Sequence, residues 1–378
     1  DTPSSRGLGD VYKRQAYTLS EGSGKETNHY VFSIKGSGIR YKSGDAMGLY
    51  PKNNERLVKD TIVKLRAKRN DLVSTGDVEE TTLENALTHR FVIHRAGKKF
   101  LTMVHDKLGK GKPKRELKAI LDDAEELEKY LFVRDYIDIM NEYQVKISPQ
   151  EFVDTLSPIA PRLYSISSSP KAHLGEIHLT VAIVKYNNFE RDRYGLATGD
   201  LARDIEVNKT EVPIYIQPTR DFVIPQDGSK DIIMVGPGTG IAPFRAFMEE
   251  RVSTGATGRN WLFFGEVHEE STFFYKDEWF DYMKKGQLTK LTTAFSRDQK
   301  EKIYVQNRIT NNGKEIWEWL DNGAYFFICG DKQYMAKDVH KALIDIAEKH
   351  GKMKREDAEH YVNQTLMKEE HRYLRDVY

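Results

Sequence analysis

The chain has 378 residues, with 58 Lys and Arg against 57 Asp and Glu, and one cysteine. This length predicts two or three domains, and the balanced charge gives no electrostatic reason to expect nucleic acid or a membrane surface as a partner. One cysteine excludes an internal disulfide, and no apolar run reaches the roughly 18 residues of a membrane-spanning helix. We therefore expect a multidomain protein of the cytoplasm, with no membrane attachment.

Residues 1–15 differ in character from the rest of the chain. They show no apolar periodicity and no signal-peptide core, and residues 4–15 resemble the translated adaptor sequence found at the ends of assembled environmental reads. We expect this segment to be a non-native or disordered leader and exclude it from the fold.

Residues 16–56 have strand character, with alternation over residues 29–34 and turns at glycines. Residues 57–154 are charged, and their apolar residues return at helical spacing, which predicts an all-α block. The clearest such series is Leu117, Ile120, Leu121, Ala124, Leu127 and Leu131. Residues 107–115 form a basic loop, which is either solvated or able to meet an acidic partner.

Strand character returns over residues 155–226, most clearly at 177–184 and 212–216. A β-barrel divided by a helical insertion accounts for this order. From residue 227 onward, strands alternate with helices, a rhythm that predicts a parallel sheet with helices on both faces. The strands are expected at residues 232–235, 261–264, 291–295 and 325–329.

The segment from Ile232 to Phe244 carries the strongest motif. A buried strand ends at Gly236, Gly238 and Gly240 follow, and a helix then begins with Pro243 in its first turn. Strand, glycine loop and helix N-terminus together predict a cradle for a nucleotide pyrophosphate. An ordinary strand-to-helix turn also uses glycine, so this motif alone is weak.

A second motif opens a strand at Arg162. Alternation places Arg162, Tyr164 and Ile166 on one face, and Leu163 and Ser165 on the other. The guanidinium could bind a phosphate, the ring could stack on a flat ligand, and the hydroxyl could reach a ring nitrogen. Taken alone, the segment fits an ordinary edge strand equally well.

Residues 194–202 form a small-residue turn that leads into a helix. Thr198 is a candidate N-cap, and the helix N-terminus could receive another phosphate. The alternative is a capped surface helix.

Taken in order, these motifs, with Ser-Arg at Ser296, Cys-Gly-Asp at Cys329 and a final Asp-Val-Tyr, resemble the ferredoxin–NADP reductase superfamily. Within it the chain is most similar to the FAD/NADPH half of diflavin reductases, and above all to the flavoprotein of NADPH-dependent sulfite reductase. The resemblance covers residues 16–378. It implies an FAD-binding β-barrel (16–56 and 155–226), an all-α connecting insertion (57–154) and a doubly wound α/β NADP-binding domain (227–378).

The resemblance also implies the residues that bind FAD, and it implies no metal. Tyr164 would stack on the isoalloxazine, Ser165 would lie near its N5, and Arg162 would bind a phosphate. Asp200 departs from the family pattern, because it places a carboxylate near the expected phosphate. The full expected set is His94, Arg162, Leu163, Tyr164, Ser165, Thr180, Val181, Ala182, Tyr186, Gly195, Leu196, Ala197 and Thr198.

For the nicotinamide nucleotide, cations and hydroxyls after the strand at residues 291–295 could bind a 2′-phosphate, which favours NADPH. Glu266 is the rival signal, because an acid after the second strand often binds the ribose of NAD. The expected set is Gly238, Thr239, Gly240, Ser296, Arg297, Lys302, Ile303, Tyr304, Val305, Gln306, Asp338 and Tyr378.

In the family, residues matching Ser165, Cys329 and Asp376 assist hydride transfer, and one matching Tyr378 covers the flavin. Read without the resemblance, Cys329 in its apolar strand is ordinary core. The implied activity is hydride transfer from NADPH to FAD. Single electrons would then pass to FMN in a flavodoxin-like domain and on to a sulfite reductase haemoprotein, which makes sulfide for cysteine biosynthesis.

The expected partner domain is not recognisable in this sequence. We find no flavodoxin-type phosphate loop before Ala16, so we expect either a fragment or a free-standing reductase that uses a separate carrier. Two alternatives stay open: a reductase serving a haem monooxygenase or flavodoxin, and a non-catalytic nucleotide-binding module. Ser165, Cys329 and Asp376 together argue against the last.

Overall fold

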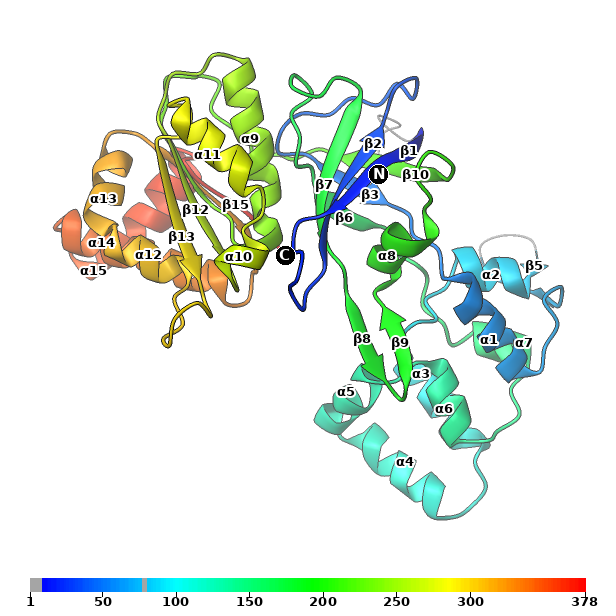
Figure 1. The fold of residues 1–378 in the computed structure, drawn as a ribbon. Helices are drawn as coiled ribbons and strands as arrows, with labels where there is room; N and C mark the ends of the chain where they lie inside the picture. The colour runs from blue at the N-terminus through cyan, green and yellow to red at the C-terminus, as the bar shows by residue number, and fades with distance from the viewer. Residues whose placement is uncertain (1–8, 77–79) are drawn as a thin grey trace. The chain divides into compact units, whose positions relative to one another are not determined.

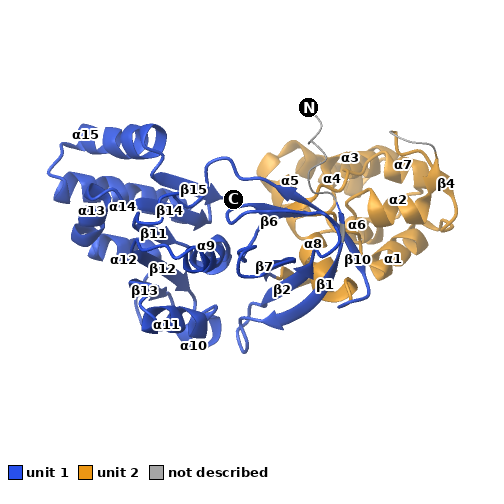
Figure 2. Ribbon diagram, turned by 90° about the horizontal axis from the view of Figure 1, so that it is seen from above, with its two compact units in different colours: residues 1–48, 163–182, 207–378 blue, residues 49–162, 183–206 orange. Residues whose placement is uncertain are grey.

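The computed structural model describes residues 9–76 and 80–378. The chain divides into two compact units (Figure 2), which we call unit 1 and unit 2. Unit 1 takes the chain up to Gly48, Leu163–Ala182 and Val207–Tyr378, and unit 2 takes Leu49–Arg162 and Ile183–Glu206. Unit 2 is therefore larger than the insertion expected at residues 57–154, because it begins earlier and includes a second segment.

Unit 1 contains an antiparallel sheet with the strand order β6-β3-β10-β1-β2-β7 (Figure 1). Beyond β6, an isolated bridge joins Ile166 to Leu179 of β7, so the two edges of the sheet meet as a barrel requires. The barrel predicted from the strand pattern is therefore confirmed. The strands are β1 (Gly9–Thr18), β2 (Thr27–Ser33), β3 (Ala46–Leu49), β6 (Arg162–Ser165), β7 (Glu176–Ala182) and β10 (Glu211–Gln217).

The first strand corrects the treatment of residues 1–15 as a leader. Residues 9–15 belong to β1, which pairs with β10 on one side and with β2 on the other. Val11 and Lys13 are buried while Tyr12 and Arg14 are exposed, which is the alternation of a half-buried strand. Backbone pairing on both sides holds this polar segment, which its few apolar side chains did not predict. Residues 1–8 lie outside the described part of the chain.

The rest of unit 1 is a parallel sheet with the order β13-β12-β11-β14-β15. Along β11, Ile232 and Met234 pack on one face and Ile233 and Val235 on the other, so helices cover both faces as predicted. The strands are β11 (Ile232–Val235), β12 (Asn260–Glu266), β13 (Lys290–Phe295), β14 (Tyr325–Gly330) and β15 (Tyr373–Val377).

The helices divide between the two faces of this sheet (Figure 1). One face packs against η2 (Gly238–Ile241), α9 (Ala242–Ser253) and α11 (Lys276–Lys284), near the short α10 (Glu269–Thr272). The other face packs against α12 (Val305–Asn311), α13 (Gly313–Asp321), α14 (Met335–His350), α15 (Arg355–His360) and η3 (Tyr361–Glu369).

Strand β15 was not expected from the sequence. Its five residues include Arg375 and Asp376, so no apolar run marks it. It pairs in parallel with β14 at the edge of the sheet, in a register that sets Cys329 opposite Asp376.

Unit 2 is mainly helical and has its own core, in which Phe100, Tyr136 and Phe152 pack edge to face. The apolar series from Leu117 to Leu131 spans two helices, because the Asp123 side chain caps a new helix. The helices are α1 (Glu55–Leu65), α2 (Leu83–His89), α3 (Lys98–Lys107), α4 (Lys112–Asp122), α5 (Ala124–Phe132), α6 (Tyr136–Glu142) and α7 (Pro149–Val153).

Two small sheets complete unit 2: β4 (Leu72–Val73) with β5 (Thr81–Thr82), and β8 (Lys185–Asn188) with β9 (Arg191–Tyr194). The second hairpin belongs to the unit because Arg191 and Arg193 pair with the buried Asp135 and Asp138 beside α6. After it come α8 (Leu196–Gly199) and the π-helix η1 (Asp200–Asp204). Among the residues described in both units, no helix is long and apolar enough to cross a membrane.

Candidate functional site

A cavity of about 490 Å3 opens in unit 1 where the antiparallel sheet faces the glycine segment of the α/β region. It brings together many residues predicted from distant parts of the sequence. A cavity of this size and composition suits a flat organic ring. Its lining is Gly44, Ala46, Leu163, Tyr164, Ser165, Thr180, Val181, Ala182, Gln217, Pro218, Thr219, Thr239, Ala242, Asp376 and Tyr378.

Ser165 and Asp376 meet in this cavity. Ser165 Oγ donates a hydrogen bond to Asp376 Oδ2 at 2.8 Å, and Cys329 Sγ lies 3.8 Å from the same oxygen. Burial, and then the Asp376 carboxylate, raise the pKa of the Cys329 thiol. Cys329 therefore stays protonated near neutral pH and is a weak hydrogen-bond donor, not a nucleophile. The three residues predicted to act together are thus in contact.

Tyr378 is held in place by backbone and side-chain contacts. Its N–H donates to Gly330 O at 3.2 Å, and its carbonyl accepts from Lys332 N at 3.1 Å. Its hydroxyl lies 3.1 Å from Thr239 Oγ1, while 64% of the residue stays exposed. Tyr378 is therefore anchored through its main chain and its hydroxyl, while much of the residue's surface stays exposed beside the cavity.

The glycine segment forms η2, and glycine is required at two of its positions for different structural reasons. Gly238 has φ of 57°, a backbone conformation that favours glycine. A Cβ added at Gly240 would lie 2.2 Å from Cys329 O, so glycine there lets η2 pack directly on the end of β14. The sequence suggested that a ligand approaches these glycines, whereas at Gly240 the neighbour is the chain itself.

Strand β6 brings Leu163, Tyr164 and Ser165 to the lining of the cavity. Leu163 is exposed, Tyr164 and Ser165 are half-buried, and the next residue, Ile166, is fully buried. The expected division of these side chains between two faces stays a prediction.

On β7, the expected adenine contacts have different surroundings. The Thr180 hydroxyl lies 2.6 Å from the buried Tyr275 OH, and the Val181 side chain is buried, whereas Ala182 is exposed. A ligand at this strand would therefore meet its main chain and Ala182 before the Thr180 hydroxyl.

Unit 2 holds the other residues expected to bind FAD, and three of them, His94, Gly195 and Leu196, line a cavity of about 550 Å3. His94 Nδ1 is buried and has no hydrogen-bond partner among the described residues. Burial, with Arg162 and Arg95 nearby, lowers the pKa of His94 to about 4, so the ring is neutral at pH 7. A buried nitrogen in this state is stabilised by a ligand that bonds to it.

The sequence suggested that Thr198 is the N-cap of a helix, but the structure shows otherwise. Gly195 occupies that position, and Thr198 lies within α8, where its hydroxyl accepts from Val184 N at 3.3 Å and lies 3.4 Å from Gly195 O. Asp200, expected to crowd a phosphate, is buried and accepts from Lys52 N at 3.2 Å. Ala197 is buried in α8, and Tyr186 lies half-buried on β8.

The residues after β13 divide into exposed and structural groups. Arg297, Lys302 and Tyr304 are exposed, and Ser296 is half-buried after the end of the strand. Val305, by contrast, belongs to the core of the α/β region, and Ile303 packs against that core, so neither presents its side chain freely to a ligand.

Glu266, the residue that would favour NAD, forms a hydrogen bond to its neighbour in the chain: its Oε2 accepts from Val267 N at 2.7 Å. Gln306 Nε2 donates to Asp338 Oδ2 at 3.0 Å, which joins α12 to α14. Glu266 Oε2 thus has a main-chain partner, whereas Arg297 and Lys302 are exposed.

Comparison with known proteins decides the family. Residues 11–199 match the model of the FAD binding domain, and residues 234–341 match that of the oxidoreductase NAD-binding domain. The chain belongs to this FAD-binding oxidoreductase family. Its cofactors are FAD and a nicotinamide adenine dinucleotide. The first match begins at residue 11, so it includes residues 11–15 of strand β1.

Curated relatives carry one printed name. The chain is 42% identical over 363 residues to the sulfite reductase [NADPH] flavoprotein alpha-component of Bacillus subtilis, covering 94% of this chain and 58% of that protein. It is 40% identical over 356 residues to the protein of the same name from Vibrio vulnificus, covering 94% and 56%. The chain thus spans somewhat more than half the length of these relatives.

For the FAD-binding oxidoreductase, the structure adds cavity residues that the sequence did not single out. Gly44, Ala46 and the segment 217–219 line the cavity of unit 1. The one available signal was position, because Pro218 and Thr219 follow the predicted strand at residues 212–216. Ala242 was included only as the start of a helix.

Proposed function

We propose that this chain is the FAD- and NADPH-binding portion of a sulfite-reductase-type flavoprotein. It would oxidise NADPH and pass electrons through an FMN-containing, flavodoxin-like domain or protein to a sulfite reductase haemoprotein. The observation that carries the proposal is the contact of Ser165, Asp376 and Cys329 inside the cavity of unit 1. The family match and the printed names of the relatives support the choice of acceptor.

When bound, the two cofactors supply hydride transfer and its division into single electrons. The protein supplies charge and position. The Asp376 carboxylate, held by the Ser165 hydroxyl, brings negative charge to the cavity, where it stabilises positive charge that develops on a pyridine ring. The neutral Cys329 thiol orients that carboxylate without covalent chemistry.

Tyr378 would cover the flavin ring and give way to nicotinamide. Its anchored backbone and exposed ring support this role, since only the side chain needs to move. For the other end of the nucleotide, we propose that Ser296, Arg297, Lys302 and Tyr304 bind the 2′-phosphate of NADPH. The exposed side chains of Arg297, Lys302 and Tyr304 support this choice over NADH.

We also propose residues for FAD, in each unit separately. In unit 1, Tyr164 and Ser165 line the cavity, where Tyr164 would stack on the flavin ring. In unit 2, His94 offers a buried nitrogen that lacks a partner among described residues, and Arg162 offers an exposed cation. We place the reaction in the cytoplasm, which suits a chain with one cysteine.

Reconstitution tests the proposal. The purified chain should become yellow with FAD, and NADPH should bleach its visible absorbance without oxygen. Addition of a flavodoxin-like FMN protein and a sulfite reductase haemoprotein should then yield sulfide from sulfite. A chain that stays colourless with FAD contradicts the proposal. A chain that reduces other carriers but yields no sulfide contradicts the acceptor alone.

A further inference from the structure

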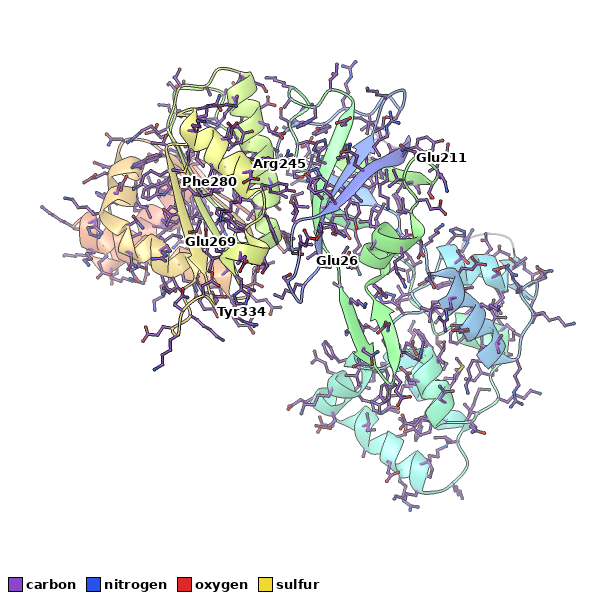
Figure 3. All side chains as sticks on the ribbon, in the orientation of Figure 1. Glu26, Glu211, Arg245, Glu269, Phe280 and Tyr334 are labelled. Atoms are coloured by element: carbon purple, nitrogen blue, oxygen red, sulfur yellow. The ribbon has the colours of Figure 1, made fainter. Side chains whose placement is uncertain are left out.

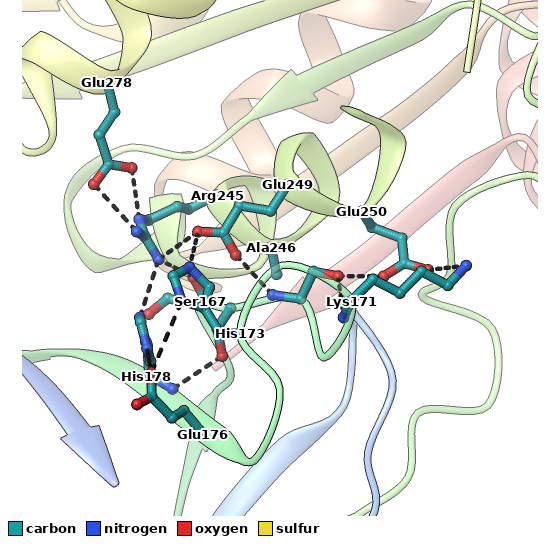
Figure 4. Close-up of polar contacts among 12 residues, drawn as sticks. Ser167, Lys171, His173, Glu176, His178, Arg245, Ala246, Glu249, Glu250 and Glu278 are labelled. Carbon is teal, nitrogen blue, oxygen red and sulfur yellow. Dashed lines mark hydrogen bonds and ion pairs between the residues drawn. The ribbon is translucent and has the colours of Figure 1, made fainter. Parts of the chain in front are cut away.

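Helix α9 buries charged side chains on the face it turns toward the antiparallel sheet of unit 1. Arg245 and Glu249, one helical turn apart, are only 6% and 5% exposed. Arg245 projects from α9 toward the sheet (Figure 3), and Figure 4 shows the polar contacts around it. Burial of charge is costly, so these contacts must be well made.

The pair bonds the segment that follows β6. Arg245 Nη1 donates to Ser167 O at 2.8 Å and lies 2.9 Å from Glu249 Oε1. Glu249 Oε2 accepts from Ser169 N at 2.7 Å. The guanidinium also reaches Glu278 of α11 at 2.7 Å and 3.1 Å. Arg245 and Glu249 thus join the sheet to two helices of the α/β region, and we call them the α9 clamp (Figure 4).

Histidines surround the α9 clamp without forming a cation site. His173, Glu176 and His178 bring ligand atoms within 4.8 Å of one another. However, His178 Nδ1 lies 3.4 Å from Arg245 Nη1 and must accept, which leaves Nε2–H to donate to Glu176 at 3.2 Å. In that tautomer His178 Nε2 has no lone pair for a metal, and the guanidinium repels a cation. The histidines therefore complete a hydrogen-bonded network.

The α9 clamp belongs to a closed ring of contacts that includes the candidate site. Ser167 lies two residues after Ser165, whose hydroxyl donates a hydrogen bond to Asp376. Asp376 lies opposite Cys329, and Gly240 packs against the Cys329 carbonyl. Gly240 leads through η2 into α9, which carries Arg245 back to Ser167. Every link in this ring is short, so a shift at the α9 clamp moves Ser165 relative to Asp376.

We propose that Arg245 and Glu249 are positioning residues, which set the Ser165–Asp376 contact and thereby the approach of nicotinamide to flavin; this inference rests on the proposed function. Neither residue is among those that line the cavity. Tyr164 and Ser165 line the cavity on the side of the sheet, and Thr239 and Ala242 line it on the opposite side. Arg245 and Glu249 act by holding these two sides in a fixed relative position. Displacement of about 1 Å between reacting groups can slow a reaction about 100-fold.

Two mild variants of the FAD-loaded chain test this. Arg245→Lys keeps the charge but loses the forked geometry, and Glu249→Gln keeps the size but loses the charge. Both should lower the limiting rate of flavin reduction by NADPH about 10- to 100-fold in stopped-flow measurements. FAD content and the apparent Kd for NADPH should change less than about twofold. A kinetic isotope effect with NADPH deuterated at the transferred position should show that hydride transfer limits the rate.

The matched control is Arg251→Lys. Arg251 is a buried arginine on the same helix, but Nη2 donates at 2.9 Å to the carbonyls of Lys230 and Gly258, away from the cavity. This variant should lower Tm without slowing flavin reduction. A double-mutant cycle adds a second readout: in a Ser165→Ala background, Arg245→Lys should cause a smaller loss of rate, because the α9 clamp acts through Ser165.

Clamp variants that lose stability yet reduce flavin at the wild-type rate would overturn the inference and leave Arg245 and Glu249 a structural role. Fully additive losses with Ser165→Ala would do the same. If either variant fails to fold, the other decides. Failure of the wild-type chain to be reduced by NADPH is a different result, since it contradicts the proposed function itself.

Discussion

Asp376 lies directly opposite Cys329 on neighbouring parallel strands, and its carboxylate accepts a hydrogen bond from Ser165, 211 residues earlier in the chain. Two kinds of tertiary pairing produce this contact. Strand β15 fixes Asp376 beside Cys329, and the approach of β6 to the parallel sheet supplies Ser165. These two pairings hold the negative charge of Asp376 in a fixed position beside Cys329 and Ser165.

Asp376→Asn should slow flavin reduction by NADPH by about 10- to 100-fold, because it removes the charge that opposes the developing pyridinium charge. Asparagine still accepts from Ser165, so thermal unfolding should change little. Stopped-flow absorbance of the flavin measures the rate. Asp331→Asn is the control, since Asp331 follows β14, accepts from the N–H groups of Tyr334 and Met335, and is not among the residues that line the cavity. Equal rates in the two variants would contradict the role of Asp376.

Arg297→Ala should raise the apparent KM for NADPH by about 10- to 100-fold, the effect of one lost charge-assisted hydrogen bond. The KM for NADH should stay unchanged, because NADH lacks the 2′-phosphate. The exposed Lys300, in the same segment, provides the control variant Lys300→Ala. A similar loss with both nucleotides would exclude a 2′-phosphate contact at Arg297.

Gly240→Ala should destabilise unit 1 by about 2 kcal/mol or more, because its Cβ would lie 2.2 Å from the Cys329 carbonyl oxygen. Denaturant unfolding measures the change. Gly24→Ala, where a Cβ meets nothing within 4 Å, should alter the free energy of unfolding by less than about 0.5 kcal/mol. Unchanged stability in Gly240→Ala would show that η2 does not pack on β14 as described.

Acid should destabilise unit 1 through its buried histidines. Burial, with His173 and Arg245 nearby, lowers the pKa of His178 from 6.5 to about 3. The unfolded chain therefore binds a proton near pH 6.5 that the folded chain refuses until about pH 3. Stability is full above pH 6.5 and falls as the pH drops through this window, by up to about 1.4 kcal/mol per pH unit for each such histidine.

Denaturant unfolding at several pH values checks this slope. His178→Gln should flatten the dependence below pH 6.5, whereas His371→Gln, at an exposed position, should leave it as in the wild type. If stability is independent of pH in this window, His178 is not buried in its neutral form.

The parallel strands show how far sequence patterns reach. Strands β11, β12 and β14 are buried on both faces, so apolar runs marked them in advance, whereas β13 was marked by a shorter run that includes two threonines. Strand β15 and residues 9–15 escaped notice, because backbone pairing holds them and charged side chains interrupt their apolar residues. The apolar series from Leu117 to Leu131 predicted helix without a boundary, and the structure places a boundary at Asp123, whose carboxylate caps α5.

For the site, the family resemblance pointed to Tyr164, Ser165, Thr239, Cys329 and Asp376, whose roles stay predictions, but it did not say how these residues meet. Thr198 was misplaced as a cap, because turn composition alone does not set where a helix begins. Val305 was included with the ligand segment, although its side chain packs in the core. Periodicity describes one segment at a time, and these errors concern packing between segments.

The sequence by itself determined the order of the domains, four of the five parallel strands and the residue types available for two nucleotide cofactors, because local apolar patterning and turn chemistry encode these. Tertiary structure alone decided that Asp376 stands opposite Cys329, that Ser165 reaches it, and that Arg245 is buried against Ser167. Those relationships depend on strand register and on burial of charge, which arise only when segments far apart in the chain exclude water together.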